Sequence, residues 1–379
     1  MRILHVSDCY APRTGGIETQ VRDLARAQAA EGHEVHVLTA TPGPNGERGG
    51  LVTDDDGVQV HRLGARLPFD LPVNPAAPPR MRALLRGLAP DVVHVHAGVV
   101  SPFAYDGARA ARAEERPLAI TWHCMLDGTV PALRALARLD GWHRAPVALS
   151  AVSAAAAERV REVFGVPVGV VPNGVDLSSW TPAGGATSSA ARSSTSGTVR
   201  CVATMRLAPR KRGQALLAII EDAVSQLEPD QLRVDVIGDG PSRAGMARRA
   251  VRRGLVDVVT LRGRMSREDL AAEYAGADVF LAPAVLEAFG IAALEARAAG
   301  LVVVARRGTG IEEFITDGVD GLLVDDDACM TRAIVRLVRE PALLERLRAH
   351  ARTHRPLHGW PTTLSAARAE YARAGALRP

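Results

Sequence analysis

Two segments in the second half of the chain carry charged side chains that could hold a phosphorylated ligand. In residues 205–213, Arg206 and Lys211 stand with further arginines between an apolar strand pattern and an apolar helix pattern. Cations disfavour the start of a helix unless an anion offsets them, and a pyrophosphate would be such an anion. A solvated basic turn without a ligand is the alternative interpretation.

Lys211 is also singled out by composition, because it is the only lysine among 46 basic residues. Arginine-rich coding explains the general excess of arginine. A lysine that persists in such a chain indicates a position where a compact ammonium group is needed and a planar guanidinium does not replace it. Chance is the alternative explanation.

The second segment, residues 282–296, places Glu287 and Glu295 eight positions apart among apolar residues. Carboxylates in an apolar setting are costly unless they are paired or hydrogen-bonded. On one helix, eight residues of about 1.5 Å each would separate the two backbones by roughly 12 Å. A glycosidase pair has its carboxyl groups only about 5 to 10 Å apart. The spacing therefore favours two contacts along one extended ligand, with Glu295 as an ordinary surface residue left as the alternative.

In the first half of the chain, glycines and histidines follow predicted strands. Gly15 and Gly16 stand between the first strand and the first helix, where backbone N–H groups can approach an anion. A tight turn without a ligand is equally open. His96 and His123 each end a predicted strand, a position that is more often structural than catalytic. His94 is expected to be packed or at the surface.

Short apolar strand patterns alternate with helical patterns along most of the chain. Strands are predicted at residues 2–7, 35–39, 58–62, 92–96, 118–122, 148–152, 168–171, 200–204, 232–237, 258–261, 279–281 and 301–305. This alternation predicts an α/β protein with two Rossmann-like doubly wound domains that face a cleft. Residues 181–198 are almost purely Gly, Ala, Ser and Thr, and we interpret them as a flexible linker between a domain at 1–180 and a domain at 199–354.

The overall composition narrows the class of protein. A chain of 379 residues with 47% apolar residues is long enough for two cores. Its four cysteines are widely spaced, which fits a reducing cytoplasm, and neither a signal peptide nor a membrane span is predicted. A net charge of +4 suits a phosphate-bearing ligand, whereas 4% aromatic content gives no support for nucleic acid. The acidic runs at 54–56 and 325–327 are interpreted as solvated turns, with weak cation binding as the alternative, so no metal site is predicted.

The ordered set of motifs resembles the retaining glycosyltransferases of family 4, which have the GT-B fold. The resemblance spans nearly the whole chain. Its motifs are GGIE (15–18), DVVHVH (91–96), PNGVD (172–176), RLAPRK (206–211), the two glutamates at 287 and 295, AAGLVVVA (298–305), GIEEFITDGVDGLLV (310–324) and a segment around Trp360. The chain departs from the family pattern at Ala284, Arg297, Leu301 and Glu312, none of which is an expected ligand contact.

The resemblance implies roles for residues in the second domain. Arg206 and Lys211 would hold the diphosphate of a nucleotide sugar, Glu295 would bind its ribose, and Glu287 would bind the transferred sugar. Main-chain groups of three further residues would contact sugar and phosphate, and these are Phe289, Gly290 and Ile291.

It also implies roles for residues elsewhere. Gly15 and Gly16 would approach the donor from the other domain, and His123 would lie near the reacting face of the sugar. Arg262 and Gly263 would lie by the base. The closing segment, 355–379, would form a helix that returns to the first domain.

The function implied is transfer of a hexosyl unit, with retention, from a nucleotide-diphosphate sugar to a hydroxyl acceptor such as a glycolipid, a polyol or a small glycoside precursor. No cofactor and no tightly bound metal would be needed. A sugar-nucleotide epimerase or phosphorylase on the same fold and a non-catalytic sugar-nucleotide sensor are the alternatives. A nicotinamide-dependent oxidoreductase is disfavoured, because Gly15 and Gly16 lack the full GxGxxG series.

The place of action is expected to be the cytoplasm. Arg80, Arg82 and Arg86 lie with leucines on a predicted helix that could rest on the anionic inner face of the cell membrane. A plain surface helix is the alternative.

Overall fold

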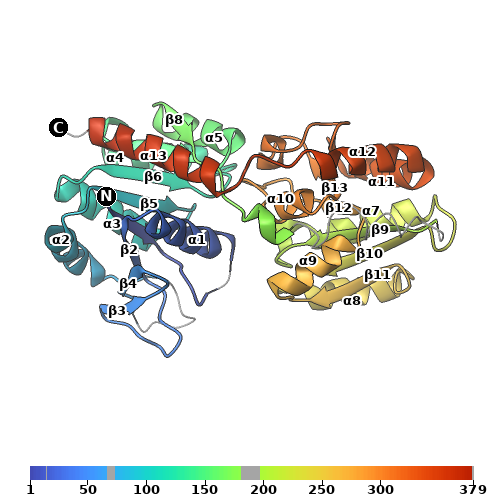
Figure 1. Ribbon diagram of the computed structural model, residues 1–379, viewed down its shortest axis with the longest axis horizontal. Helices are drawn as coiled ribbons and strands as arrows, with labels where there is room; N and C mark the ends of the chain where they lie inside the picture. Colours follow the sequence, from blue (N-terminus) through green and yellow to red (C-terminus); the bar gives the residue numbers. More distant parts are fainter. Residues whose placement is uncertain (14, 66–72, 181–196, 378–379) are drawn as a thin grey trace. The chain divides into compact units, whose positions relative to one another are not determined.

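The computed structural model describes residues 1–13, 15–65, 73–180 and 197–377. The chain folds into two compact units, and each is built on one sheet with helices on both faces (Figure 1). Unit 1 comprises Met1–Gly174 and Trp360–Pro379, and unit 2 comprises Val175–Gly359. The prediction of an α/β protein with two parallel-sheet domains is confirmed.

Unit 1 contains an eight-stranded sheet in the order β3-β4-β2-β1-β5-β6-β7-β8. All neighbours are parallel except β3 and β4, which pair antiparallel. The strands are β1 (Arg2–Ser7), β2 (Glu34–Thr39), β3 (Leu51–Asp54), β4 (Val58–Arg62), β5 (Val92–Ala97), β6 (Leu118–Trp122), β7 (Ala148–Ala151) and β8 (Val168–Val170). The helices are α1 (Gly16–Ala30), α2 (Ala77–Leu88), α3 (Pro102–Ala113), α4 (Val130–Leu139), α5 (Ala154–Phe164) and α13 (Trp360–Ala376).

The two faces of this sheet differ in what covers them. On one face, Leu4, Val93 and Ile120 belong to the core that α2, α3, α4 and α5 cover. On the other face, β5, β6 and β7 pack against α13, through a small core that includes Ala119 and Tyr371. Figure 1 shows α13, in red, among the blue and green elements of unit 1. The expected return of the closing helix to the first domain is therefore observed.

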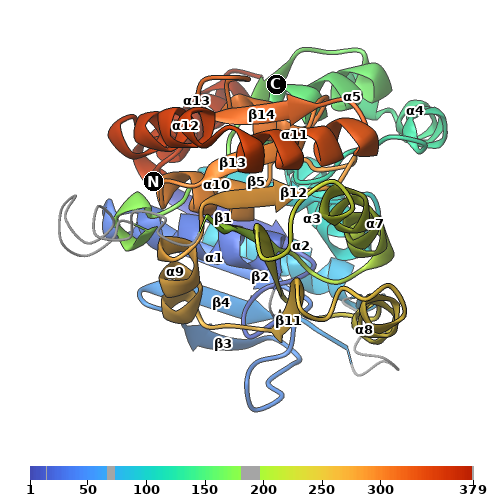
Figure 2. The same ribbon diagram turned by 90° about the vertical axis from the view of Figure 1, so that its right-hand side faces the viewer.

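Unit 2 contains a six-stranded parallel sheet in the order β11-β10-β9-β12-β13-β14. Its strands are β9 (Val199–Thr204), β10 (Leu232–Ile237), β11 (Val259–Gly263), β12 (Val279–Ala282), β13 (Val302–Arg306) and β14 (Gly321–Val324). Its helices are α7 (Gly213–Val224), α8 (Arg243–Arg252), α9 (Arg267–Ala275), α10 (Ile291–Ala298), α11 (Asp327–Arg339) and α12 (Pro341–Thr353). Figure 2 shows α7, α8 and α11 along one face of the sheet and α9 along the other.

The chain passes from unit 1 to unit 2 earlier than the sequence predicted. The division falls after Gly174 rather than after residue 180, and unit 2 extends to Gly359 rather than to 354. The physical reason is the short 3-10 helix η3 (Leu177–Trp180), whose Trp180 is buried with its ring 5.5 Å from that of Tyr274 in α9. Most of the predicted linker, residues 181–196, lies outside the described residues.

Candidate functional site

The loops that carry the charged segments of unit 2 lie where the strand order reverses. From β9 the chain runs through α7 to β10 on one side, and from β12 it runs through α10 to β13 on the other. β9 and β12 themselves are neighbours. Ligands of doubly wound sheets bind beyond the carboxyl ends of the strands at such a reversal. The fold therefore brings residues 205–212, which follow β9, next to residues 283–290, which follow β12.

An ion pair joins these two loops. The ammonium group of Lys211 donates to Oε2 of Glu287, and the two side chains are 23% and 20% exposed. Lys211 ends the 3-10 turn η4 (Pro209–Lys211), directly before α7. The adjacent Arg212 donates two hydrogen bonds, of 2.9 and 2.7 Å, to the carboxylate of Asp327. In this structure, carboxylates of the protein itself thus offset the cations at the start of α7.

Arg206 differs from these neighbours, because its side chain is exposed and has no ion pair or hydrogen bond to any residue that the structure describes. Its backbone is well fixed. Leu207 N donates to Asp239 O at 2.8 Å, and Gly238, with φ +126°, lies so close that a Cβ there would stand 2.0 Å from Met205 O. A free guanidinium on a fixed loop beside the Lys211–Glu287 pair is suited to meet an incoming anion.

The start of α10 supplies backbone donors to the same place. Gly290 precedes the helix with a left-handed backbone, φ +89°, and no side chain caps the helix start. The N–H groups of the first turn, which begins at Ile291, lack acceptors within the helix, and the helix dipole favours negative charge there. Phe289 is buried and packs on Phe314, which fixes the loop. Donors and cations from two loops therefore converge at one strand edge.

The remaining predicted residues of unit 2 surround this edge. Glu295 is half-buried in the middle of α10, while Glu287 lies in the loop before it, so the two carboxylates do not share a helix. Burial and the nearby Glu295 carboxylate raise the pKa of Tyr274 well above its ordinary value. Gly263 ends β11 with φ +80°, and Arg262 is held by Asp235 at 2.8 Å.

In unit 1, the strand order reverses between β1 and β5, and the predicted residues lie after β1, near the end of β5 and after the neighbouring strand β6. Gly15 precedes α1 and Gly16 is its first residue. His123 directly follows β6, and its Nε2 is 3.0 Å from Nδ1 of His96. His94 is fully packed, 1% exposed, on the same face of β5 as His96.

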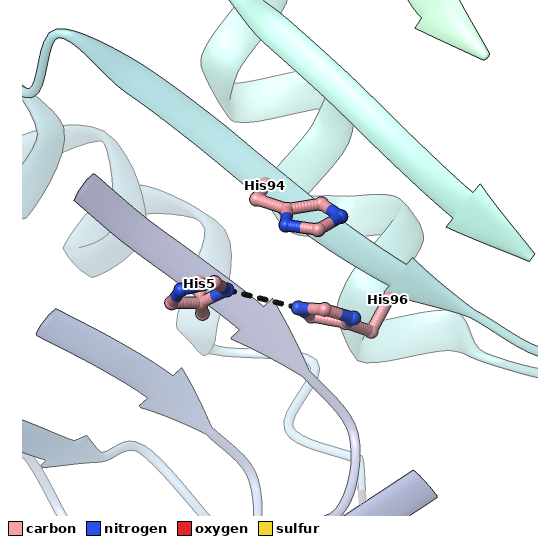
Figure 3. A group of neighbouring side chains, drawn as sticks. All are labelled: His5, His94 and His96. Carbon is pink, nitrogen blue, oxygen red and sulfur yellow. Dashed lines mark hydrogen bonds between the residues drawn. The ribbon is translucent and has the colours of Figure 1, made fainter. Parts of the chain in front are cut away.

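His96 belongs to a cluster whose members lie on two strands that are too far apart in the sequence for the cluster to be predicted from it. His5 and His94 are its other buried members, and Figure 3 shows the hydrogen bond between His5 and His96, with His94 beside them. Burial lowers the pKa of His5 and of His123 to about 4, and burial followed by neighbouring imidazoles lowers the pKa of His94 and His96 well below the ordinary value. All four rings are therefore neutral near pH 7.

The cluster also has the residue types of a metal site. Nitrogens of His5, His94 and His96 lie within 4.8 Å of one another, and among the described residues this is the one group of three metal-binding side chains so close together. Each ring nitrogen already has a hydrogen-bond partner, however, on a side chain of unit 1. A cavity of about 10 Å³ beside His96 and His123 has room for about one water molecule. The observed geometry is that of a hydrogen-bonded cluster.

Side chains of the two acidic runs (54–56 and 325–327) and of the basic helix α2 form ion pairs and hydrogen bonds with neighbouring residues. Asp55 binds Arg26 and accepts a 2.8 Å hydrogen bond from Tyr10, and Asp326 caps α11. Asp54, Asp56, Asp325 and Asp326 are exposed, as the interpretation of solvated turns expects, whereas Asp55 and Asp327 are partly buried and form ion pairs with Arg26 and Arg212. In α2, Arg82 binds Glu114 at 2.8 Å. No helix among the described residues has the length and apolar character needed to cross a membrane.

Comparison with known proteins agrees with this architecture. The family model of Glycosyltransferase Family 4 matches residues 14–179, and that of Glycosyl transferases group 1 matches residues 197–340. The D-inositol 3-phosphate glycosyltransferase of Nocardiopsis dassonvillei is 30% identical over 407 residues, covering 95% of this chain and 91% of the relative. The enzyme of the same name from Streptomyces scabiei is 28% identical over 411 residues, covering 99% and 90%.

Solved structures share the fold. HepE of Anabaena, crystallised with UDP, superposes with a TM-score of 0.72 at 19% identity over 98% of this chain and all of that one. A glycosyltransferase of Rickettsia africae superposes with a TM-score of 0.75 at 16% identity over 98% of both chains.

Proposed function

The chain belongs to the family 4 glycosyltransferases, and from that premise we propose that it moves a hexosyl unit from a nucleotide-diphosphate sugar to a hydroxyl acceptor with retention of configuration. The observation that carries the proposal is the convergence, at the strand reversal of unit 2, of the Lys211–Glu287 pair, the free guanidinium of Arg206 and the start of α10. These groups suit a ligand that has both a diphosphate and sugar hydroxyls.

Each group has a role in the proposed reaction. Arg206, Lys211 and the first-turn amides of α10 bind the diphosphate, so that negative charge developing on the leaving group meets fixed positive charge. Glu287, already hydrogen-bonded to Lys211, accepts hydrogen bonds from the transferred sugar and holds the ammonium group toward the phosphates. Glu295 binds the ribose hydroxyls. The anomeric carbon–oxygen bond breaks, the acceptor oxygen bonds to the same face of that carbon, and the acceptor proton passes to the leaving phosphate oxygen.

The acceptor is proposed from the relatives. The similar enzymes of Nocardiopsis and Streptomyces are named for D-inositol 3-phosphate, and a polyol phosphate is a hydroxyl acceptor of the class expected from the sequence. Reaction without a tightly bound metal and action in the cytoplasm remain part of the proposal. Contact with the inner membrane face through α2 also remains a prediction, which sedimentation with anionic liposomes would test.

The test is turnover with a panel of nucleotide-diphosphate hexoses and D-inositol 3-phosphate, in the presence of a chelator. We expect release of nucleoside diphosphate that depends on the acceptor, and a product whose anomeric configuration, read by NMR, equals that of the donor. Lys211→Ala and Glu287→Ala should each abolish turnover. Arg210→Ala is the matched control, because Arg210 is an exposed cation of the same turn without a partner among the described residues, and it should keep activity.

Other outcomes would support other functions. Conversion of the donor to its epimer in the absence of acceptor would show an epimerase, and dependence on inorganic phosphate would show a phosphorylase. Tight donor binding with no turnover for any acceptor would favour a sensor. Inversion at the anomeric carbon would overturn the same-face mechanism alone.

A further inference from the structure

A continuous series of hydrogen bonds crosses the buried face of unit 1 beneath α1 and α13. It runs from His123 through His96 and His5 to Gln28 of α1, with separations of 3.0, 2.9 and 2.7 Å. From Gln28 it continues through Tyr371 of α13 to His94, both at 2.9 Å. We call these six side chains, together with Thr121 and Ser150, the histidine network.

The sheet geometry explains why these side chains meet. Side chains alternate between the two faces of a strand, so residues two apart point the same way. His94 and His96 are two apart on β5, and they align with His5 and Ser7 on β1 and with Ala119 and Thr121 on β6. Parallel strands in this register place the polar side chains of three strands side by side on one face.

Gln28 determines the direction of these hydrogen bonds. Its amide nitrogen donates to the Tyr371 hydroxyl at 2.9 Å, so its amide oxygen, which can only accept, faces His5 Nε2 at 2.7 Å. Tyr371 has one proton, and its other partner among the described residues is His94 Nδ1 at 2.9 Å, so Tyr371 donates to that nitrogen and neutral His94 carries its proton on Nε2. His94 Nε2 lies 2.7 Å from Thr121 Oγ1, which accepts this proton and lies 2.8 Å from Ser150 Oγ.

The same reasoning continues toward His123. With its proton on Nε2, neutral His94 accepts at Nδ1 from the Tyr371 hydroxyl, and Tyr371 accepts in turn from the Gln28 amide nitrogen. The Gln28 amide oxygen is then the acceptor for His5 Nε2, His5 Nδ1 accepts from His96 Nε2, and His96 Nδ1 accepts from His123 Nε2. The lowered pKa values described above support this order, since each neutral ring has one donor and one acceptor.

We propose that the histidine network fixes the tautomer of His123, with the proton on Nε2 and an unprotonated Nδ1 that is available to accept a hydrogen bond from a ligand hydroxyl. His123 is partly exposed, and its Nδ1 has no partner among the residues that the structure describes. His96, His5 and Gln28 are thus positioning residues that act through His123. The tautomer assignment does not depend on the reaction, whereas its effect on transfer rests on the proposed function.

The first test is the tautomer itself, read from the ring ¹⁵N resonances of the full-length protein labelled with [¹⁵N]histidine. We expect His5, His94, His96 and His123 all to carry the proton on Nε2. An Nδ1–H tautomer at His123 would overturn the proposal, and this measurement on the unaltered protein needs no variant to fold.

Variants then test the connection. His96→Gln keeps one donor and one acceptor and should leave His123 as the Nε2–H tautomer, whereas His96→Leu should produce a mixture of tautomers. Gln28→Leu should likewise loosen the assignment. Gln20→Leu is the matched control on the same helix, because Gln20 is also buried and lines the cavity beside His123 but bonds to the backbone of Gly174 outside the network, and it should leave His123 as the Nε2–H tautomer. If neither His96→Leu nor Gln28→Leu changes the tautomer of His123, the network is contradicted.

Activity provides the second readout. If His123 acts on a ligand hydroxyl through Nδ1, His96→Leu should lower kcat by about fivefold, the value of one hydrogen bond of ordinary strength, and His96→Gln should restore most of it. A tautomer shift without any change in kcat would confine the network to a structural role and overturn the positioning role. If the unaltered protein has no transferase activity but the leucine variants still change the tautomer of His123, the proposed function is contradicted and the tautomer assignment stands.

Discussion

Replacement of Arg297 by methionine should destabilise unit 2 and loosen the helix that faces the proposed donor. Arg297 lies near the end of α10 and is 2% exposed. Its guanidinium pairs with Asp320 at 3.0 Å and donates hydrogen bonds of 2.7 Å to the backbone oxygens of Ala351 and His354. It thereby ties α10, whose first turn is part of the candidate site, to α12. Methionine fills similar space but donates no hydrogen bond.

The magnitude follows from what the substitution leaves behind. Among the described residues, the Asp320 carboxylate then keeps only the 2.8 Å hydrogen bond from Thr316 N, and two backbone oxygens lose the donation from Arg297. Removing one partner of a buried ion pair costs about 3 to 5 kcal/mol. For a unit of this size the melting temperature should fall by roughly 6 to 20 °C.

The assay is differential scanning calorimetry of the full chain, with donor affinity measured in parallel. Arg336→Met is the control, because Arg336 is an exposed arginine of α11 whose partner Glu340 is one helical turn away, and its loss should cost within about 0.5 kcal/mol. Asp320→Asn in the Arg297→Met background should cost less than it does alone, because the unpaired charge is removed. A loss below about 1 kcal/mol for Arg297→Met would refute the reasoning, since that is the range of an exposed pair.

Two further predictions concern the site and the acid response. Gly290→Ala should cost about 1 to 3 kcal/mol of stability and weaken donor binding in titration calorimetry, because φ is +89° and the new Cβ would lie 2.5 Å from Ile311 Cγ1. Gly308→Ala, with φ +72° and no atom within 4 Å, isolates the backbone contribution. Urea unfolding should show stability falling as pH decreases from about 6.5 to 4, because the unfolded chain binds protons that the buried histidines refuse. Burial raises the pKa of Asp8 to about 6, so Asp8 opposes this trend. His96→Gln removes one such histidine and should lower the slope of unfolding free energy against pH by about 1.4 kcal/mol per pH unit, and an unchanged slope would contradict this.

The strand pattern was largely predictable because buried parallel strands are short apolar runs. The predictions at 2–7, 58–62, 118–122 and 232–237 coincide with β1, β4, β6 and β10. β3 was not predicted, because Leu51–Asp54 is mostly exposed and pairs antiparallel at the edge of the sheet, where no apolar run is needed. The sequence of β14 was noted only as part of the motif at 310–324, and α11 and α12 were not predicted.

The candidate site was predictable in part. Arg206, Lys211 and Glu287 could be found because unusual charged residues follow strands, and the strand order then explains their convergence. That Lys211 and Glu287 bind each other could not be read from residues 76 positions apart. The division after Gly174 could not be predicted, because it depends on the packing of a single residue, Trp180, against Tyr274 of unit 2. The composition of residues 181–198 indicated a later boundary.

The histidine network shows what a linear pattern cannot provide. His94 and His96 stand two apart in a strand, which indicates a shared face, but His5 and Thr121 join them only through the register of β1 and β6 against β5. Gln28 and Tyr371 come from helices at opposite ends of the chain, on α1 and α13. A buried polar group is tolerated when its partners are complete, so each of these residues is compatible with the core only because the others are present. The network therefore had to be identified in three dimensions. Its one ring nitrogen without a partner among the described residues is on His123, the residue that the family resemblance predicts to lie near the sugar.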